Sequence, residues 1–198
     1  MKRLHRTDLF TWSQFREPLN IDFNATLWTR PGGNVLIDPL ALSAHDQKHL
    51  EELGGAAFVI ITNSMHVRAA SEHPKAQLFG PRAEKDNFPV KCSRWLGDGE
   101  EVFPGLIAYE LDGSKTPGEL ALVLDGTTLI TGDLIRAHRA DTLGLLKPEQ
   151  NLKDKQAALA SIQRVMKLHP GIEHIVVGDG WHCFCRAKVL LERLLTEG

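Results

Sequence analysis

The 198-residue chain has few cysteines, no basic excess and no long apolar run. Its three cysteines cannot all pair internally, which favours a reducing, cytoplasmic location. A formal net charge of −2 supplies no basic field for nucleic acid. No stretch approaches the roughly 18 apolar residues that span a bilayer, so no membrane partner is expected. Residues 1–10 lack an uninterrupted apolar core after their basic residues, and we therefore expect no signal peptide.

The remaining composition is that of a folded protein. Hydrophobic residues make up 42% of the chain and charged residues 24%, which excludes extended disorder. The length suits one domain over residues 1–198. Predicted strands come first along the chain and mixed strands and helices follow, an order that favours an α+β or α/β layered fold.

Local patterns predict the individual elements. Ser43 is an expected N-cap for a helix over 44–53, and Pro170 ends the clearest helix, over 153–168. A short helix over 67–72 and a final helix over 185–195 are also expected, and 81–104 reads as irregular. Strands are predicted over 7–15, 21–30, 34–38, 56–62, 76–79, 106–111, 120–124, 127–130 and 172–177.

The segment 111–133, LDGSKTPGELALVLDGTTLITGD, is the most informative part of the sequence. Asp125-Gly126 is a two-residue hairpin signal, because such turns need positive φ. Asp133 then stands at the end of a strand, where sheets present ligands. This segment resembles the T-P-G-H-T-P-G…G-D signature of the metallo-β-lactamase superfamily. The resemblance implies one four-layer αβ/βα sandwich, with two mixed β-sheets flanked by helices.

The resemblance also assigns roles at the strand ends. In the family the loop histidine and the closing aspartate both bind metal. Here Asp133 is present, whereas Ser114 stands in place of the histidine. Asp38 ends the strand that corresponds to the family's L-I-D strand, where the aspartate supports the site through hydrogen bonds. The family's T-H-x-H-x-D-H run aligns without gaps onto Asn63, Met65, Val67 and Arg68, and with a loop two residues shorter onto Met65 and His66.

The last strand ends in Gly-Asp-Gly where the family has Gly-His-Gly, so Asp179 takes the histidine position. A carboxylate there shifts the preference toward harder ions. His182, close to Cys183 and Cys185, is a reserve ligand. His66, Asp133 and Asp179, with His182, therefore form the predicted catalytic and metal-binding set.

Two cations stand within these altered motifs. Lys115 follows Ser114, and Arg68 follows the first motif. Either could supply permanent positive charge beside Asp133 and Asp179 and make a metal unnecessary. We expect the polar pocket to be lined by Asp38, Asn63, Arg68, Ser114 and Lys115.

Two functions follow from these readings. The first is a hydrolase with at most one metal ion (zinc, manganese or iron) that activates water against a small-molecule substrate. The alternative is a metal-free, non-catalytic binding or scaffolding protein of the same fold. A homodimer is compatible with both. The substrate cannot be read from the sequence, because this fold supports many chemistries.

Overall fold

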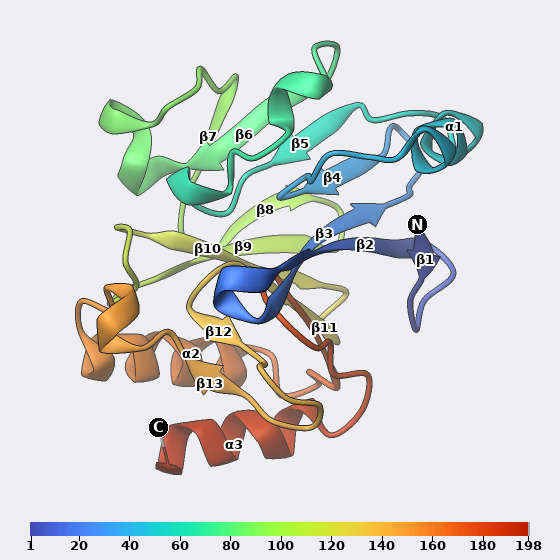
Figure 1. The fold of residues 1–198 in the computed structure, drawn as a ribbon. Coiled ribbons are helices and arrows are strands. Elements are labelled where there is room, and N and C mark those ends of the chain that lie inside the picture. The colour runs from blue at the N-terminus through green and yellow to red at the C-terminus, as the bar shows by residue number, and fades with distance from the viewer. Residues whose placement is uncertain (198) are drawn as a thin grey trace.

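Two β-sheets face each other at the centre of the molecule (Figure 1). The structure is a computed structural model that describes residues 1–197, so Gly198 of the predicted domain lies outside it. The first sheet has seven strands that neighbour one another in chain order, antiparallel from β1 to β4 and parallel from β4 to β7. Its strands are β1 (Lys2–Arg3), β2 (Leu9–Arg16), β3 (Ile21–Trp28), β4 (Val35–Ile37), β5 (Phe58–Ile60), β6 (Gln77–Pro81) and β7 (Arg94–Leu96).

The second sheet is also mixed and has the order β14-β11-β10-β9-β8, with only the β11–β14 pair parallel. A two-stranded ribbon of β12 and β13 lies beside it. These strands are β8 (Glu100–Phe103), β9 (Leu106–Leu111), β10 (Glu119–Leu124), β11 (Thr128–Thr131), β12 (Ile135–Arg136), β13 (Gly144–Leu145) and β14 (His174–Val177).

Helices cover the outer faces of both sheets (Figure 1). Leu50 of α1 (Ala44–Glu52) packs on the outer face of the first sheet. Helices α2 (Lys155–Leu168) and α3 (Ala187–Glu197) pack on the second sheet. A third apolar cluster fills the space between the sheets. The predicted four-layer αβ/βα sandwich is confirmed. None of the helices within residues 1–197 is both long and apolar enough to cross a membrane.

Most predicted elements exist, and the differences have local causes. Ser43 accepts a hydrogen bond from the Asp46 amide and caps α1, as expected. Two strands, β7 and β8, lie within the segment predicted to be irregular, because sheet pairing overrides their weak local pattern. The predicted helix over 67–72 is replaced by short 3-10 turns, η2 (Ser64–His66) and η3 (Ala70–Glu72). Three further 3-10 helices are η1 (Glu17–Leu19), η4 (Arg82–Asn87) and η5 (Pro148–Gln150).

The predicted hairpin at Asp125-Gly126 is confirmed, but its loop has three residues instead of two. Asp125 has φ 49° and Gly126 has φ 69°, as a primed turn requires. The Thr127 amide donates to the Leu124 carbonyl at 3.2 Å. Leu124 pairs with Thr128, so three residues separate the paired positions of β10 and β11.

Gly180 fixes the turn that carries Asp179. Its φ is +98°, and a Cβ there would overlap with the carbonyl oxygen of Ala137, with which it forms a β-bridge. The Gly180 amide donates to Asp22 O at 2.7 Å, and its carbonyl accepts from Asn24 Nδ2 at 2.7 Å. These contacts tie the turn after β14 to β3 in the first sheet.

We expect Gly180→Ala to lower the free energy of unfolding by about 1–3 kcal/mol or more, because alanine adds strain at positive φ and overlaps with backbone. Urea unfolding measures the change. Gly144→Ala is the matched control, since its Cβ would meet no heavy atom within 4 Å. Equal stability of the two variants would contradict this account of the turn.

Candidate functional site

Three polar side chains meet where strands of both sheets end. His66 closes η2 after β5, Asp133 follows β11, and Asp179 follows β14. Each offers a ligand atom, and these atoms all lie within 4.8 Å of one another. All three residues are buried. The structure therefore brings together the three principal residues predicted from sequence.

Asp38, directly after β4, orients the imidazole of His66. Its Oδ2 lies 2.7 Å from His66 Nδ1 and accepts from the Thr62 hydroxyl at 2.6 Å. Its Oδ1 accepts from the Thr62 amide at 2.8 Å. The ring is held so that Nε2 lies 3.3 Å from Asp133 Oδ2. This is the supporting role that the resemblance implied for Asp38.

Arg136 is the residue that sequence reasoning missed. Its Nη2 lies 2.9 Å from Asp133 Oδ1 and 2.6 Å from Asp179 Oδ2, so one nitrogen bridges the two carboxylates. The side chain is 6% exposed. The sequence did contain a signal for this role, because Arg136 stands three residues after Asp133 in an otherwise apolar segment. An arginine buried with such a segment needs an acidic partner.

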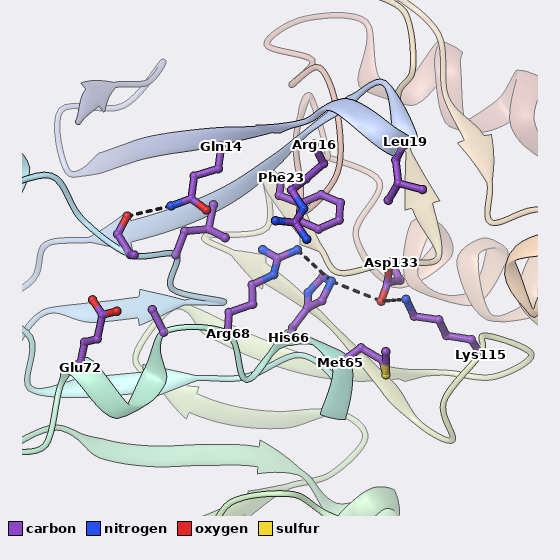
Figure 2. A pocket seen from close by; sticks show the side chains of 13 residues that line it. Gln14, Arg16, Leu19, Phe23, Met65, His66, Arg68, Glu72, Lys115 and Asp133 are labelled. Carbon is purple, nitrogen blue, oxygen red and sulfur yellow. Dashed lines mark hydrogen bonds and ion pairs between the residues drawn. The ribbon is translucent and has the colours of Figure 1, made fainter.

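The two predicted cations lie beside the predicted carboxylates. Lys115 Nζ is 2.7 Å from Asp133 Oδ2. Arg68 Nη2 is 3.4 Å from Asp179 Oδ1 and 3.0 Å from His66 Nε2. Figure 2 shows Arg68, His66, Asp133 and Lys115 in a continuous row across the pocket floor. Positive charge thus reaches both aspartates.

A further carboxylate, that of Glu119, lies behind Asp133, and the sequence analysis did not identify it either. Glu119, at the start of β10, is fully buried; its Oε2 accepts from the Ser114 hydroxyl at 2.5 Å and its Oε1 from the Leu134 amide at 2.8 Å. Asn63 Nδ2 donates to Asp133 Oδ2 at 3.1 Å. Ser114, at the position of the family's histidine, therefore turns inward to Glu119.

Charge coupling shifts the pKa values in this cluster. Burial and Arg68 lower the pKa of His66, but the Asp38 and Asp133 carboxylates outweigh them and raise it to about 9. Burial raises the pKa of Asp133, but His66 and Lys115 hold it well below its usual range. His66 and Asp133 therefore each favour the charged form of the other.

His182 lies apart from this cluster. Its Nδ1 accepts from the Val177 amide at 3.3 Å, and its Nε2 lies 3.3 Å from the Thr11 hydroxyl. Burial lowers its pKa to about 4. The turn at Gly180 reverses the chain, so the predicted reserve ligand points to β2 instead of to Asp179. Cys183, whose thiol donates to the Cys185 carbonyl, belongs to the core beneath α3.

A cavity of about 580 Å³ opens beside the cluster (Figure 2). Of the five residues predicted to line the pocket, Arg68 and Lys115 do so, whereas Asp38, Asn63 and Ser114 lie behind its wall. The difference arises because the side chains of Asp38, Asn63 and Ser114 form hydrogen bonds with buried groups and so point away from the cavity. The lining comprises Gln14, Arg16, Leu19, Phe23, Leu40, Ala41, Met65, His66, Arg68, Ala69, Glu72, Lys115 and Asp133.

Comparisons with known proteins agree with this architecture. A family model described as metallo-beta-lactamase superfamily matches residues 1–197, so the chain belongs to that superfamily. The crystal structure of DIM-1 metallo-beta-lactamase is similar, with a TM-score of 0.75, 14% identity, and coverage of 98% of this chain and 96% of that one. The mono-zinc form of FIM-1 from Pseudomonas aeruginosa has a TM-score of 0.76, 12% identity and coverage of 100% and 95%.

A metallo-beta-lactamase from Pontibacter korlensis is also similar, with a TM-score of 0.75, 15% identity and coverage of 98% and 95%. No curated protein matches the chain in sequence. At these identities the solved structures establish the fold. The substrate has to be argued from the site itself.

The superfamily usually binds zinc, and His66, Asp133 and Asp179 are close enough together to be considered as ligands. The arrangement of their atoms does not fit a divalent ion. Both oxygens of Asp133 and both of Asp179 already face cations, and the amine of Lys115 and the guanidinium of Arg136 lie within 3 Å of Asp133. His66 Nε2, the ring nitrogen nearer Asp133, also lies 3.0 Å from Arg68 Nη2, so a cation occupies this side of the ring as well.

We expect Arg136→Met to lower the free energy of unfolding by about 3–5 kcal/mol, because it leaves two buried carboxylates without their shared partner. Urea unfolding measures this cost. Arg193→Met is the control: Arg193 pairs with Glu197 at an exposed site, so the loss should be below about 1 kcal/mol.

A double variant, Arg136→Met with Asp179→Asn, should cost less than the sum of the two single changes, because both remove the same ion pair. Strict additivity, or a cost for Arg136→Met as small as that of the control, would contradict the bridging role.

Glu119 predicts a pH dependence. Burial and the Asp133 charge raise its pKa from 4.5 to about 7. As the pH rises from 4.5 to 7, Glu119 loses its proton in the unfolded chain before it does so in the folded protein. The free energy of unfolding therefore falls over this range, by on the order of 2–3 kcal/mol. Glu119→Gln should remove this fall, because its amide oxygen can still accept from the Leu134 amide and its NH2 group can donate to the Ser114 hydroxyl oxygen. Urea unfolding from pH 4.5 to 7 measures it, with the exposed Glu173→Gln as control, and parallel curves for Glu119→Gln and the parent would contradict it.

Proposed function

We propose that this chain is a small-molecule-binding protein built on the metallo-β-lactamase fold, in which side-chain cations neutralise the carboxylates of the ancestral metal site. One observation carries the proposal. A single nitrogen of Arg136 lies within hydrogen-bond distance of both Asp133 and Asp179. A fixed guanidinium in this bridging position offsets the repulsion between the two aspartates.

The charges of the cluster support the same conclusion. Lys115, Arg136 and Arg68 place three permanent positive charges against the carboxylates of Asp133 and Asp179. A divalent ion would add positive charge beside these cations and would be repelled at short range. The cluster is therefore complete as an ion-pair network. The cavity beside it remains the feature that can receive a ligand.

The second candidate function is a hydrolase with one metal ion. The proximity of His66, Asp133 and Asp179 and the superfamily membership favour it. It requires Lys115 and Arg136 to leave Asp133 and His66 to lose a proton. In the arrangement described above, each of these groups is held by a carboxylate within 3 Å. The binding function needs no such rearrangement, so we prefer it.

Metal content tests the proposal directly. We expect protein purified without chelator to contain far less than one equivalent of zinc, manganese or iron, and its melting temperature to be the same in EDTA and in excess zinc. The reason is that bound metal would stabilise the folded state by mass action. Stoichiometric metal that is lost in Asp133→Ala would overturn the proposal.

A gain of metal binding is the complementary test. Replacing both Lys115 and Arg136 by alanine would free Asp133, and we expect this double variant to raise zinc affinity, measured by a zinc-induced shift in melting temperature. Replacing the exposed Lys155 and Arg193 by alanine is the matched control. An equal zinc response in both variants would show that Lys115 and Arg136 do not block metal.

A further inference from the structure

We infer that the cavity takes an amphipathic organic anion, a carboxylate or phosphate monoester that carries an apolar chain or ring. This inference rests on the proposed binding function. It concerns the ligand class, which neither the fold nor the superfamily specifies. Three separate features of the lining carry it: cationic donors left for a ligand, two guanidiniums that contact one aromatic ring, and exposed apolar side chains at the mouth.

The first feature is charge. The lining includes three permanently charged cations, Arg16, Arg68 and Lys115, and two carboxylates, Glu72 and Asp133. Asp133 is already paired on both oxygens. Lys115 uses one contact, at 2.7 Å, and its amine has three donors, so it retains donors for a ligand. Cationic N–H donors therefore remain in the cavity for an incoming anion, although the buried carboxylates already have partners.

Arg16, at the end of β2, is the clearest donor left for a ligand. Within residues 1–197 its guanidinium forms no salt bridge and contacts the Phe23 ring, with Cζ 5.5 Å from the ring centroid. Arg68 Cζ lies 5.0 Å from the same centroid. Stacking on an aromatic ring leaves the N–H groups at the guanidinium edge available. Phe23 thus orients Arg16 and leaves its donors free, and Figure 2 shows the two side chains next to each other.

The apolar part of the ligand is inferred from the side chains at the mouth of the cavity. Leu19 is 50% exposed and Met65 is 64% exposed, and they come from η1 and η2 on separate segments of the chain. Both line the cavity together with Phe23 and Leu40. An apolar group bound between Leu19 and Met65 would remove these side chains from water, which contributes about 25 cal/mol for each Å² buried.

Anion and apolar group must belong to one molecule, because the cations and the apolar side chains line the same cavity. Inorganic phosphate would pair with the cations but would leave the apolar side chains at the mouth exposed. A neutral apolar molecule would cover those side chains but would leave the remaining cationic donors without a partner. An amine with an apolar chain would meet the same mouth but would be repelled by Arg16 and Lys115. Inorganic phosphate and the amine therefore serve as the controls.

Calorimetry on the full-length protein in EDTA tests the inference with octanoate and octyl phosphate as probes, and octylamine and inorganic phosphate as controls. We expect at least one octyl anion to bind about tenfold or more tightly than either control. The better of the two anions identifies the head group as carboxylate or phosphate. Equal binding of octylamine, or no binding of either octyl anion, would overturn the inference.

Variants assign the two halves of the ligand. Arg16→Gln should weaken binding of the octyl anion about fivefold or more, because it removes an unpaired charge, whereas the exposed Arg193→Gln should leave it unchanged. Leu19→Ser with Met65→Ser should weaken the octyl anion without altering the weak binding of inorganic phosphate. The exposed Leu168→Ser is the control. Unchanged affinity in both test variants would also overturn the inference.

The two proposals fail separately. If the octyl anions do not bind but metal content stays low and EDTA has no effect, only the ligand class is wrong. If stoichiometric metal is present and is lost in Asp133→Ala, the proposed function is wrong, whatever the probes do. Melting temperatures of all variants establish that they are folded before binding is compared.

Discussion

The contact of one Arg136 nitrogen with both Asp133 and Asp179 is the interaction on which the site depends. These aspartates end neighbouring parallel strands, β11 and β14, so the sheet itself forces two carboxylates together in a buried place. Without a cation between them their repulsion would be large at low dielectric. Arg136, three residues beyond Asp133, supplies that cation from within the same chain segment.

The rest of the cluster is built around this bridge. Asp38 fixes His66, and together with Asp133 it raises the pKa of the imidazole to about 9. Lys115 covers the outer oxygen of Asp133, and Arg68 covers the free oxygen of Asp179. Each carboxylate therefore has a partner on every side. A network of this kind is tightly specified, because removal of one member leaves a buried charge exposed to its neighbours.

Sequence patterns predicted most of the fold but only part of the site. The β10–β11 hairpin and the clearest helix, α2, were found because turn residues and apolar periodicity are local signals. Strands β7 and β8 were missed because their stability comes from partners far along the chain. His66, Asp133 and Asp179 were found because they follow strands whose order matched a family pattern. Arg136 and Glu119 were missed because nothing local marks a residue as the partner of a distant carboxylate.

The sequence by itself determined the layered fold and the strand ends that carry polar residues, Asp38, Asp133 and Asp179 among them. Tertiary structure alone decided which charges meet. It turned Ser114 inward to Glu119, sent His182 to Thr11, and placed Arg136 between two aspartates. The physical reason is that hydrophobic periodicity is a property of residues close together in the sequence. An ion pair depends on distances that are set only when both sheets have packed together.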